Sequence, residues 1–547
     1  MQTFNSPLEA FNYWVKNTPD NIYLRQPING KFIEYSYRKA DEEIRRMASA
    51  IKKLNLGPNP HIALLSKNCA HWLMADLAIM MAGGVSIPIY PTLDPDSISQ
   101  ILTHSESKAI FIGKLDNYES QKPGIKGIIK IGVELYGIHE DHCWDKLIKK
   151  NEPLKDIHIQ KPEDLLTIMY TSGTTGAPKG VMHKVSSFNE VANTFIKAYP
   201  LPDFGRFFSY LPLSHIAERI GIEIVSMYKG GVVSFAESLD TFAQDLESVQ
   251  PQLFFGVPRI WQKFKEKILL KLPQKKMDLL LKIPIVSGII KKKLRYKLGL
   301  SDSLVFAGAA PIAIDLLEWF DRLGIEINQA YGMTEDSISS HFNFPGRNKF
   351  GTVGKPLPGV ETKLSPEGEV LIKNKSLTIG YYKEKEKTAE IFTEDGFLKT
   401  GDIGEYDHDG YLTITGRIKD QFKTDKGKYI SPAPIELELL KNTDIDQVCV
   451  VGTGIAQPIA LIIPSESGKQ KAKDELSKSL STTLIEVNNK LQAYEKIEKA
   501  VIMKEDWSVD NGLLTPTLKV KRNRVEAIHT PMYQSWFSQA DKVIFES

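Results

Sequence analysis

The stretch Thr171-Ser172-Gly173-Thr174-Thr175-Gly176-Ala177-Pro178-Lys179-Gly180 decides how this chain folds. It follows residues 165–170, an apolar and partly β-branched run that predicts a buried strand. Glycines let backbone N–H groups converge on an anion, hydroxyls add donors and the lysine adds a positive charge, so the stretch predicts a loop that binds nucleotide phosphate. A Walker-type loop is excluded, because Pro178 stands in place of its second glycine and Gly180 in place of the Ser or Thr after the lysine. A solvated turn is the alternative for a short motif, but ten specified positions after a buried strand favour the phosphate loop.

The composition is that of a globular protein with little net charge. The 547 residues are 42% hydrophobic and 25% charged, and the net charge of +2 gives no reason to expect nucleic acid as a partner. The three cysteines lie far apart without metal-ligand spacing, so we expect a reducing, cytoplasmic setting without disulfides. The N-terminus shows no basic and then apolar signal pattern.

The most membrane-like stretch covers residues 72–90. Asp76, a glycine pair and Pro88 interrupt it. It therefore predicts a buried helix over 72–82 and a buried strand over 85–90, and not a membrane span.

Strand-like and helix-like runs alternate along most of the chain, which predicts an α/β fold with mostly parallel sheets in a large N-terminal body. Three of the strand-like runs cover residues 61–65, 109–112 and 232–235. Between about 351 and 417 short strands separated by turns predict a small β-rich subdomain.

After Arg417 the pattern restarts with helix-like runs over 435–441 and 473–491 and a strand-like run over 447–452. We therefore expect an N-terminal domain over 1–418, a hinge at Lys419 and a small, mobile α+β C-terminal domain over 419–547.

The phosphate loop and several later segments resemble the adenylate-forming superfamily of acyl-CoA synthetases, adenylation domains and luciferases. The resemblance covers about residues 8 to 525. The segments are Thr171 to Gly180, Leu211-Pro212-Leu213-Ser214-His215, Gly308-Ala309-Ala310-Pro311, Tyr331-Gly332-Met333-Thr334-Glu335, Thr400-Gly401-Asp402 with Arg417, Gly427 to Pro432, and Leu514 to Arg522.

The resemblance implies a site for ATP. Lys179 would meet the γ-phosphate, Tyr331 would stack on adenine, and Asp402 with Arg417 would hold the ribose. The residues that it assigns to cofactor binding are Thr171, Ser172, Gly173, Thr174, Thr175, Gly176, Lys179, Gly308, Ala309, Ala310, Pro311, Tyr331, Gly332, Met333, Asp402, Arg417, Lys423 and Gly427. Alone, the segment at 308–311 also fits a plain strand–turn–helix junction.

The resemblance also implies the catalytic residues. Thr334 would donate to the α-phosphate, and Glu335 with Thr171 would hold Mg²⁺, which prefers hard oxygen ligands. His215 would sit between the carboxylate and the adenylate, or it is a packed side chain. Lys519 is the candidate for the lysine that bridges the carboxylate and the α-phosphate. The superfamily often has glycine before this lysine, where Leu518 stands here, and Lys521 is the competing candidate.

Two further segments point to the long-chain branch of the superfamily. In the stretch from Phe254 to Trp261, Trp261 beside Gly256 is expected to gate an apolar acyl channel, unless it is a core tryptophan. The loop that begins at Gly427 is expected to help build the tunnel for the pantetheine arm of CoA, although an ordinary turn before a helix is the alternative.

The region 263–297 has twelve Lys or Arg and two acidic residues, with apolar residues between the charged clusters. Such a stretch fits peripheral contact with a membrane surface. A solvated helical hairpin with one buried face fits it as well.

The resemblance therefore predicts a ligase that activates a long-chain fatty acid with ATP and Mg²⁺ and transfers it to CoA. The nearest alternative is a fatty acyl-AMP ligase that loads a carrier protein. A non-catalytic acyl-nucleotide binding protein is a third reading, which the intact set of Lys179, Glu335, Asp402, Arg417 and Lys519 argues against.

Overall fold

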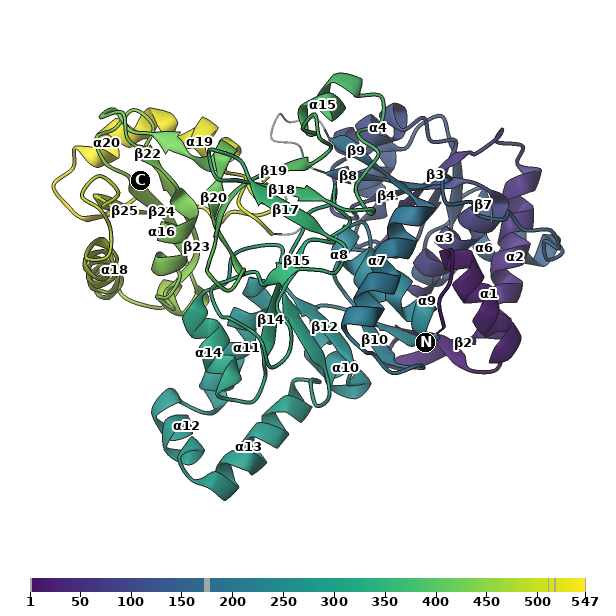
Figure 1. Ribbon diagram of the computed structural model, residues 1–547, viewed down its shortest axis with the longest axis horizontal. Coiled ribbons are helices and arrows are strands. Elements are labelled where there is room, and N and C mark those ends of the chain that lie inside the picture. Colours follow the sequence, from purple (N-terminus) through teal and green to yellow (C-terminus); the bar gives the residue numbers. More distant parts are fainter. Residues whose placement is uncertain (1, 172–177, 510, 516–517, 547) are drawn as a thin grey trace.

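The computed structural model describes residues 2–171, 178–509, 511–515 and 518–546. Ser172, Gly173, Thr174, Thr175 and Gly176 of the phosphate loop therefore lie outside the described residues. A broad N-terminal body and a smaller C-terminal domain lie side by side, with a small antiparallel sheet above the place where they meet (Figure 1).

The first large sheet of the body has seven strands. Its order is β7 (His142–Cys143), β6 (Ile129–Gly132), β5 (Ala109–Ile112), β3 (His61–Leu65), β4 (Val85–Ile89), β8 (Leu165–Thr171) and β9 (Lys179–Lys184). Every pair is parallel except the edge pair β8–β9. The strand expected before the phosphate loop is thus β8, which lies inside a parallel sheet, as its continuous apolar run predicts.

The second large sheet has nine strands. Its order is β16 (Lys355–Pro356), β15 (His341–Phe342), β14 (Ile327–Tyr331), β13 (Leu304–Ala307), β12 (Leu253–Gly256), β10 (Arg206–Ser209), β11 (Val232–Phe235), β1 (Ile22–Ile28) and β2 (Lys31–Ser36). The strands from β14 to β1 are parallel, and the edge pairs β1–β2, β14–β15 and β15–β16 are antiparallel.

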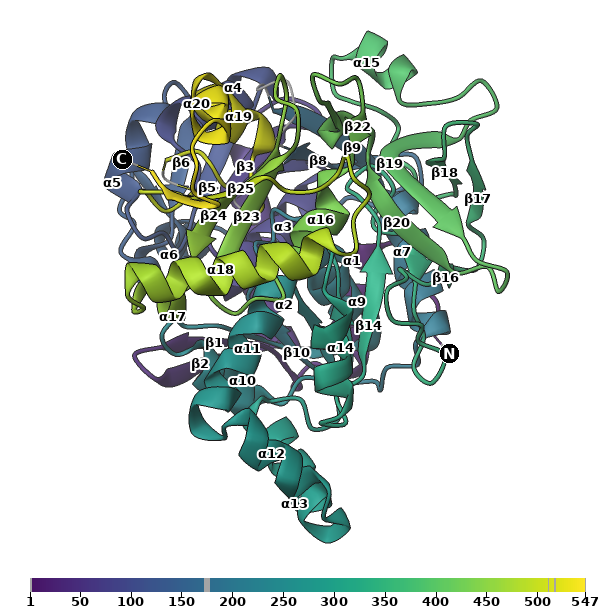
Figure 2. The same ribbon diagram turned by 90° about the vertical axis from the view of Figure 1, so that its left-hand side faces the viewer.

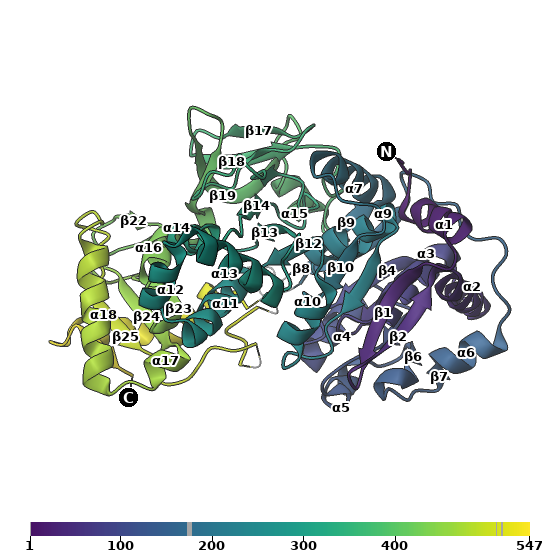
Figure 3. The same cartoon turned by 90° about the horizontal axis from the view of Figure 1, so that it is seen from below.

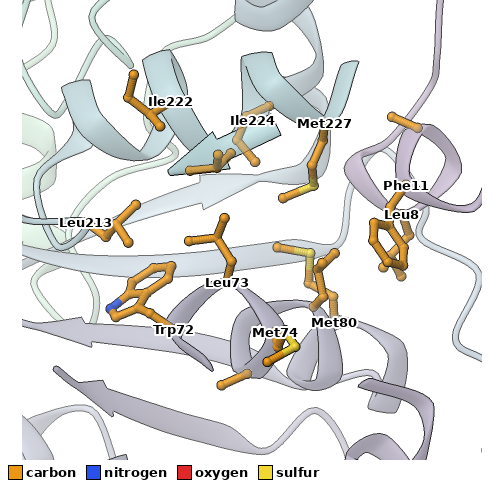
Figure 4. Packing of buried hydrophobic residues seen from close by; sticks show 14 of the residues in the cluster. Leu8, Phe11, Trp72, Leu73, Met74, Met80, Leu213, Ile222, Ile224 and Met227 are labelled. Atoms are coloured by element: carbon orange, nitrogen blue, oxygen red, sulfur yellow. The ribbon is translucent and has the colours of Figure 1, made fainter. Parts of the chain in front are cut away.

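Helix α3 (Ala70–Ala82) lies in the largest core of the body. Trp72, Leu73 and Met80 project from it, with side chains of the segment 222–227 above them and those of α1 (Pro7–Asn17) to one side (Figure 4). The helix begins two residues earlier than expected, because Gln26 accepts the Ala70 N–H at 2.9 Å, and it ends at Gly83, whose φ is 79°. Among the described helices, none has the length and apolar character needed to cross a bilayer.

The remaining helices of the body cover the sheets or connect their strands. They are α2 (Tyr37–Lys53), α4 (Pro95–His104), α5 (Tyr118–Gln121), η1 (Lys122–Gly124), η2 (Glu134–Tyr136), α6 (Trp144–Lys150), α7 (Val185–Ala198), α8 (Ile216–Glu218), the π-helical η3 (Arg219–Ile224), α9 (Val225–Lys229), α10 (Phe242–Val249), α11 (Pro258–Lys271), α12 (Gln274–Leu281), α13 (Pro284–Lys297), α14 (Ile314–Asp321) and α15 (Lys385–Glu390).

An antiparallel sheet forms the β-rich part. Its strands are β17 (Glu361–Leu364), β18 (Glu369–Lys373), β19 (Leu398–Tyr406) and β20 (Leu412–Arg417), in that order. It begins ten residues later than the expected start at 351, because β16 joins the nine-stranded sheet instead.

The C-terminal domain follows η4 (Ile418–Asp420), which contains Lys419. Its main sheet has the order β23 (Ile445–Val451), β24 (Ile459–Pro464), β25 (Lys499–Ile502) and β26 (Val543–Phe545), with one antiparallel and two parallel pairs. Its other elements are β21 (Phe422–Lys423), β22 (Tyr429–Ile430), α16 (Pro432–Leu439), α17 (Glu466–Lys469), α18 (Lys473–Asn488), α19 (Arg522–His529), η5 (Thr530–Met532) and α20 (Tyr533–Phe537).

Helix α18 buries the apolar face that its sequence pattern predicts. Leu476, Leu480, Leu484 and Val487 recur at helical spacing and are the face that it buries in the domain core. The expected fold class is confirmed: an α/β body with mostly parallel sheets, followed by a small α+β domain.

Candidate active site

The ends of the phosphate loop lie at the carboxyl end of β8. Thr171 is the last residue of β8, Lys179 is the first of β9, and the two residues pair directly across the strands. Because β8 runs parallel to β4, this edge is where open α/β sheets bind ligands.

A tyrosine that the sequence did not single out joins two of the expected site residues. The segment around Tyr381 runs along β9, with Met182 N–H donating to Gly380 at 3.0 Å and Tyr382 N–H donating to Gly180 at 2.8 Å. The Lys179 ammonium lies 4.9 Å from the centre of the Tyr381 ring. The Tyr381 hydroxyl donates to Oε1 of Glu335 at 2.7 Å. One side chain therefore fixes the positions of both the lysine and the carboxylate.

Glu335 is suited to hold a magnesium ion beside a nucleotide. The residue is only 8% exposed, and Tyr381 occupies one of its oxygens. Among the described residues no group of three or more His, Cys, Asp or Glu could hold a metal by itself. Mg²⁺ is commonly bound through one or two carboxylates together with phosphate oxygens and water, and Glu335 and Thr171 are the residues that would supply oxygen ligands here.

Asp402 is held between two side chains. The Tyr331 hydroxyl donates to its Oδ2 at 2.7 Å, and Nε of Arg417 donates to its Oδ1 at 2.6 Å. Asp402 and Arg417 face each other in the ladder between β19 and β20, so the pair is built into the sheet. The Asp402 N–H donates to the Thr400 hydroxyl at 3.1 Å. Such a fixed carboxylate can accept hydrogen bonds from two vicinal hydroxyls, as ribose recognition requires.

Lys519 lies on a short loop that brings it to this ribose group. Its backbone is fixed by Thr515, which donates N–H to the Lys519 carbonyl at 2.8 Å and accepts the Lys519 N–H on its hydroxyl at 3.0 Å. The residue as a whole is exposed, and the atoms around its ammonium group desolvate that group. This desolvation, with a smaller contribution from Arg417, lowers the pKa of Lys519 to about 8. The pKa of Lys521 is also lowered, by burial first and then by the charge of Arg524, against the opposite effect of Asp94.

His215 completes this part of the site. Burial, together with the charge of Lys519, lowers the pKa of His215 to about 4, so its imidazole is neutral at pH 7. Its Nδ1 accepts the Ala217 N–H at 3.2 Å, which leaves the proton on Nε2. The segment behind it is fixed by Glu218, whose Oε1 accepts from the Ser209 hydroxyl at 2.8 Å and from the Tyr210 N–H at 2.8 Å.

Two glycines allow the expected adenine wall to form. A Cβ on Gly308 would lie 2.7 Å from the Ala330 carbonyl oxygen, and one on Gly332 would lie 2.6 Å from Cα of Ile338. Gly308 follows β13 and Gly332 follows β14, so small residues stand where the two strand ends meet. Thr334 accepts the Ser337 N–H on its carbonyl at 3.1 Å, which begins the turn that holds Glu335.

Two family models match the chain. The model of the AMP-binding enzyme covers residues 11–382, and that of the AMP-binding enzyme C-terminal domain covers residues 419–536. The chain belongs to the AMP-binding enzyme family. It is a member of the adenylate-forming superfamily and stands close to long-chain acyl-CoA synthetases.

Individual relatives cover almost the whole of this AMP-binding enzyme. A long-chain-fatty-acid–CoA ligase of Gallus gallus is 27% identical over 97% of this chain and 81% of its own length. Long-chain-fatty-acid–CoA ligase 5 of Rattus norvegicus is 29% identical over 89% of this chain and 82% of its own.

Solved structures share the fold. An anthranilate CoA ligase in complex with anthranoyl-AMP superimposes with a TM-score of 0.80 at 20% identity, over 98% of this chain and 99% of that one. The adenylation domain of a carboxylate reductase from Mycobacterium chelonae also gives 0.80 at 20% identity, over 98% and 91%.

Trp261, which was expected to gate an acyl channel, is fully buried in this AMP-binding enzyme. Its ring packs edge-on against Phe254, Phe264 and Phe320, and its indole N–H donates to the Gly256 carbonyl at 3.0 Å. A Cβ on Gly256 would lie 2.7 Å from the indole nitrogen. In this structure Trp261 therefore packs as a core residue against the place where the channel was expected.

The loop expected to meet CoA lies in the C-terminal domain. Gly427 has a φ of 76° in the turn between β21 and β22, where a side chain would be strained. The Lys423 ammonium lies 5.6 Å from the centre of the Tyr429 ring, and Tyr429 is 65% exposed. The loop thus presents an aromatic ring and a cation on the surface.

A cavity of about 230 Å³ lies elsewhere in the body. It is lined by the first residues of β3, β4 and β8 and by His158 and Asp164, which bond to each other at 2.8 Å. These are the amino ends of the parallel strands, opposite the edge that carries Thr171, so the cavity is separate from the nucleotide site.

Proposed function

We propose that this acid–thiol ligase activates a long-chain fatty acid with ATP and transfers the acyl group to CoA. One observation carries the proposal: Asp402 accepts from Tyr331 at 2.7 Å and from Arg417 at 2.6 Å, and the charges of Asp402 and Arg417 act on the ammonium of Lys519 from the C-terminal domain. A positive charge among groups suited to a nucleotide supports a reaction at the α-phosphate.

In the first half-reaction a carboxylate oxygen of the acid attacks the α-phosphorus of ATP. The new bond is P–O to the acyl group, the bond to the bridging oxygen breaks, and pyrophosphate leaves with its electron pair. Asp402 and Arg417 orient the ribose, Lys179 binds the departing phosphates, and Lys519 neutralises charge as the two anions meet. When bound at Glu335 and Thr171, Mg²⁺ would neutralise further phosphate charge.

In the second half-reaction the thiol of CoA, as thiolate, attacks the acyl carbonyl and AMP leaves. In this step the pantetheine arm of CoA must reach the acyl carbonyl, and Lys519 is not needed there. We therefore assign the N-terminal domain to residues 1–418 and a mobile C-terminal domain to 419–547, which turns about Lys419 between the two steps. Lys419 lies in η4 directly after the strand that carries Arg417, a position where a few backbone angles can reorient a domain.

The long-chain assignment rests on the named relatives and on apolar surface beside the site. Trp261 and Phe254 would border the acyl channel, and Trp261 would have to turn away from the Gly256 carbonyl to open it. Each CH₂ group that a channel buries contributes about 0.8 kcal/mol, so longer acids gain about fourfold per carbon until the channel ends.

The proposed location is the cytoplasm, with contact to a membrane through residues 263–297. Cys69, Cys143 and Cys449 are all buried free thiols, which fits a reducing compartment.

The test is pyrophosphate release with a panel of acids from acetate to hexadecanoate, with and without CoA. We expect kcat/KM to rise with chain length and a CoA thioester to form only when CoA is present. Acid-dependent pyrophosphate release without any thioester would favour a fatty acyl-AMP ligase that loads a carrier protein. A preference for acetate or an aromatic acid over every fatty acid would contradict the long-chain assignment.

A further inference from the structure

Helices α12 and α13 form a hairpin that projects away from the rest of the molecule, which we call the basic finger (residues 274–297). Two perpendicular views show it extending beyond the body (Figures 1 and 2). Its base is fixed by Gln274, which accepts from the Trp319 indole N–H at 2.9 Å, and by Lys297, which pairs with Glu247 at 2.6 Å. The finger is therefore held in one direction, with its tip free.

The exposed side chains of the finger are unusually apolar. Helix α13 has fourteen residues and none of them is buried. Ile285 is 80% exposed and Ile289 is 62% exposed, and both lie on the same side of α13 because they are four residues apart. Leu279, near the end of α12, is 65% exposed, and Ile283, in the turn between the helices, is 47% exposed. Val286, Ile290 and Leu294 form a half-buried side of α13, as a hairpin with one packed face predicts, but Ile285 and Ile289 lie outside that side.

The finger also carries unpaired positive charge along its length. Within residues 259–297, all of which the structure describes, Lys275, Lys276, Lys282, Lys292 and Lys293 are exposed and make no ion pair. The finger has a single acidic residue, Asp278, and Arg322 of the body neutralises it. No negative group within the finger thus offsets the lysines.

We propose that the basic finger docks on a membrane surface that contains anionic lipids. Its isoleucines and Leu279 enter the boundary between headgroups and acyl chains, and the lysines around them meet lipid phosphates. Lys292 and Lys293 follow Ile289 by three and four residues, so their aliphatic stems can lie along the apolar face while the ammonium groups reach the headgroups. The charge selects an anionic surface, and the apolar tip selects a lipid over an acidic protein.

This surface extends the proposed function, because long-chain acids partition into membranes and a docked enzyme would take them from there. The binding does not depend on catalysis. Vesicle binding and acid activation can therefore fail separately, and each failure identifies which of the two inferences is wrong.

The experiment is co-sedimentation of the full chain with phosphatidylcholine vesicles, with and without phosphatidylglycerol, at low and at high ionic strength. We expect binding to the anionic vesicles that weakens with added salt. Each lysine near a charged surface contributes about a fivefold change in partitioning. The variant Lys275→Gln/Lys276→Gln/Lys292→Gln/Lys293→Gln should lose on the order of 10²-fold or more. The variant Ile285→Ser/Ile289→Ser should lose about tenfold even at low salt.

Matched controls change similar residues on other parts of the surface. Lys52→Gln/Lys53→Gln alters two exposed lysines at the end of α2, and Ile159→Ser alters an isoleucine that is 82% exposed. Both should bind vesicles as the unchanged protein does. Because the substituted finger residues are all unburied, far-UV circular dichroism and pyrophosphate release should stay unchanged in every variant.

Three outcomes would overturn the proposal. One is no binding to anionic vesicles at either ionic strength. Another is binding that the finger variants leave intact. The third is an equal loss in the finger variants and in the controls, which would indicate nonspecific adsorption.

Discussion

Arg259 and Asp446 form an ion pair at 2.8 Å across the boundary between the body and the C-terminal domain. Arg259 lies in the first turn of α11 and Asp446 lies on β23. A second pair joins Lys441, after α16, to Asp315 of α14 at 3.3 Å. Seen from below, these helices lie next to the C-terminal sheet (Figure 3). If Lys519 acts in adenylation as proposed, these two pairs would stabilise the domain orientation that this step uses.

Removing the first pair should shift the balance between the half-reactions. Arg259→Gln should slow adenylation about two- to fivefold, as expected for a partly exposed pair, and leave thioester formation from supplied acyl-adenylate unchanged or faster. Arg25→Gln is the control, since it removes the same charge from a surface pair at 2.9 Å with Glu34, within β1 and β2. Equal effects of the two substitutions in half-reaction assays would show that the pair does not select a domain orientation.

Tyr381→Phe should slow adenylation about tenfold or more. The substitution removes the hydroxyl that donates to Glu335 but keeps the ring beside Lys179, and a hydrogen bond to a charged group contributes about 1.5–3 kcal/mol. The apparent affinity for Mg²⁺ should change as well, because Glu335 loses its fixed orientation. Measurements of pyrophosphate release against Mg²⁺ concentration test both effects.

Its neighbour provides the control. The Tyr382 hydroxyl donates to Glu106 at 2.8 Å on the surface, so Tyr382→Phe should change neither the rate nor the Mg²⁺ dependence. If Tyr381→Phe also leaves the rate and the Mg²⁺ dependence unchanged, the hydrogen bond from Tyr381 is not needed to orient Glu335.

Adenylation should lose activity as pH rises through about 8. The pKa of Lys519 is lowered to about 8, so the lysine is charged below this pH and neutral above it. Thioester formation from supplied acyl-adenylate should lack this loss. Lys519→Arg should move the decline to higher pH, because a guanidinium stays charged.

Lys519→Ala should reduce adenylation on the order of 10²- to 10³-fold, whereas Lys521→Ala should have little effect. The assignment is contradicted if Lys521→Ala is the more damaging of the two.

Leu518→Gly should stabilise the loop that carries Lys519. Leu518 has a φ of 62°, which strains any residue with a side chain, and it is 45% exposed, so little packing is lost. Part of the gain is offset by the greater freedom of glycine in the unfolded chain, which leaves about 0.5–1 kcal/mol. Leu518→Val should destabilise, because β-branched residues tolerate a positive φ least. Thermal unfolding of the unchanged protein and the two variants gives the order of their stabilities. If both substitutions shift the unfolding temperature in the same direction, Leu518 is not strained.

The elements that the sequence predicted best are those with strong local patterns. Residues 61–65, 109–112 and 232–235 form strands with the expected ends, because each is a short apolar run that a parallel sheet buries on both faces. The helix over 473–491 was also recognisable, and only its last three residues fall outside α18.

What the sequence could not give are contacts between residues far apart in the chain. Tyr381 reaches Glu335 across 46 residues, and Arg259 meets Asp446 across 187. No local period or motif encodes such pairs, because they depend on how the sheets and domains pack. Trp261 shows the same limit, since its packing against Phe320 is a tertiary contact that the spacing of the motif did not reveal.

Exchange of labelled pyrophosphate into ATP in the absence of CoA measures adenylation alone. In the proposed mechanism this site joins a long-chain acid to AMP with the help of Lys519 before any thiol takes part. We expect exchange that requires hexadecanoate, is not supported by acetate, and is reduced at least 10²-fold in Lys519→Ala. No acid-dependent exchange, or release of ADP and phosphate in place of AMP and pyrophosphate, would contradict it.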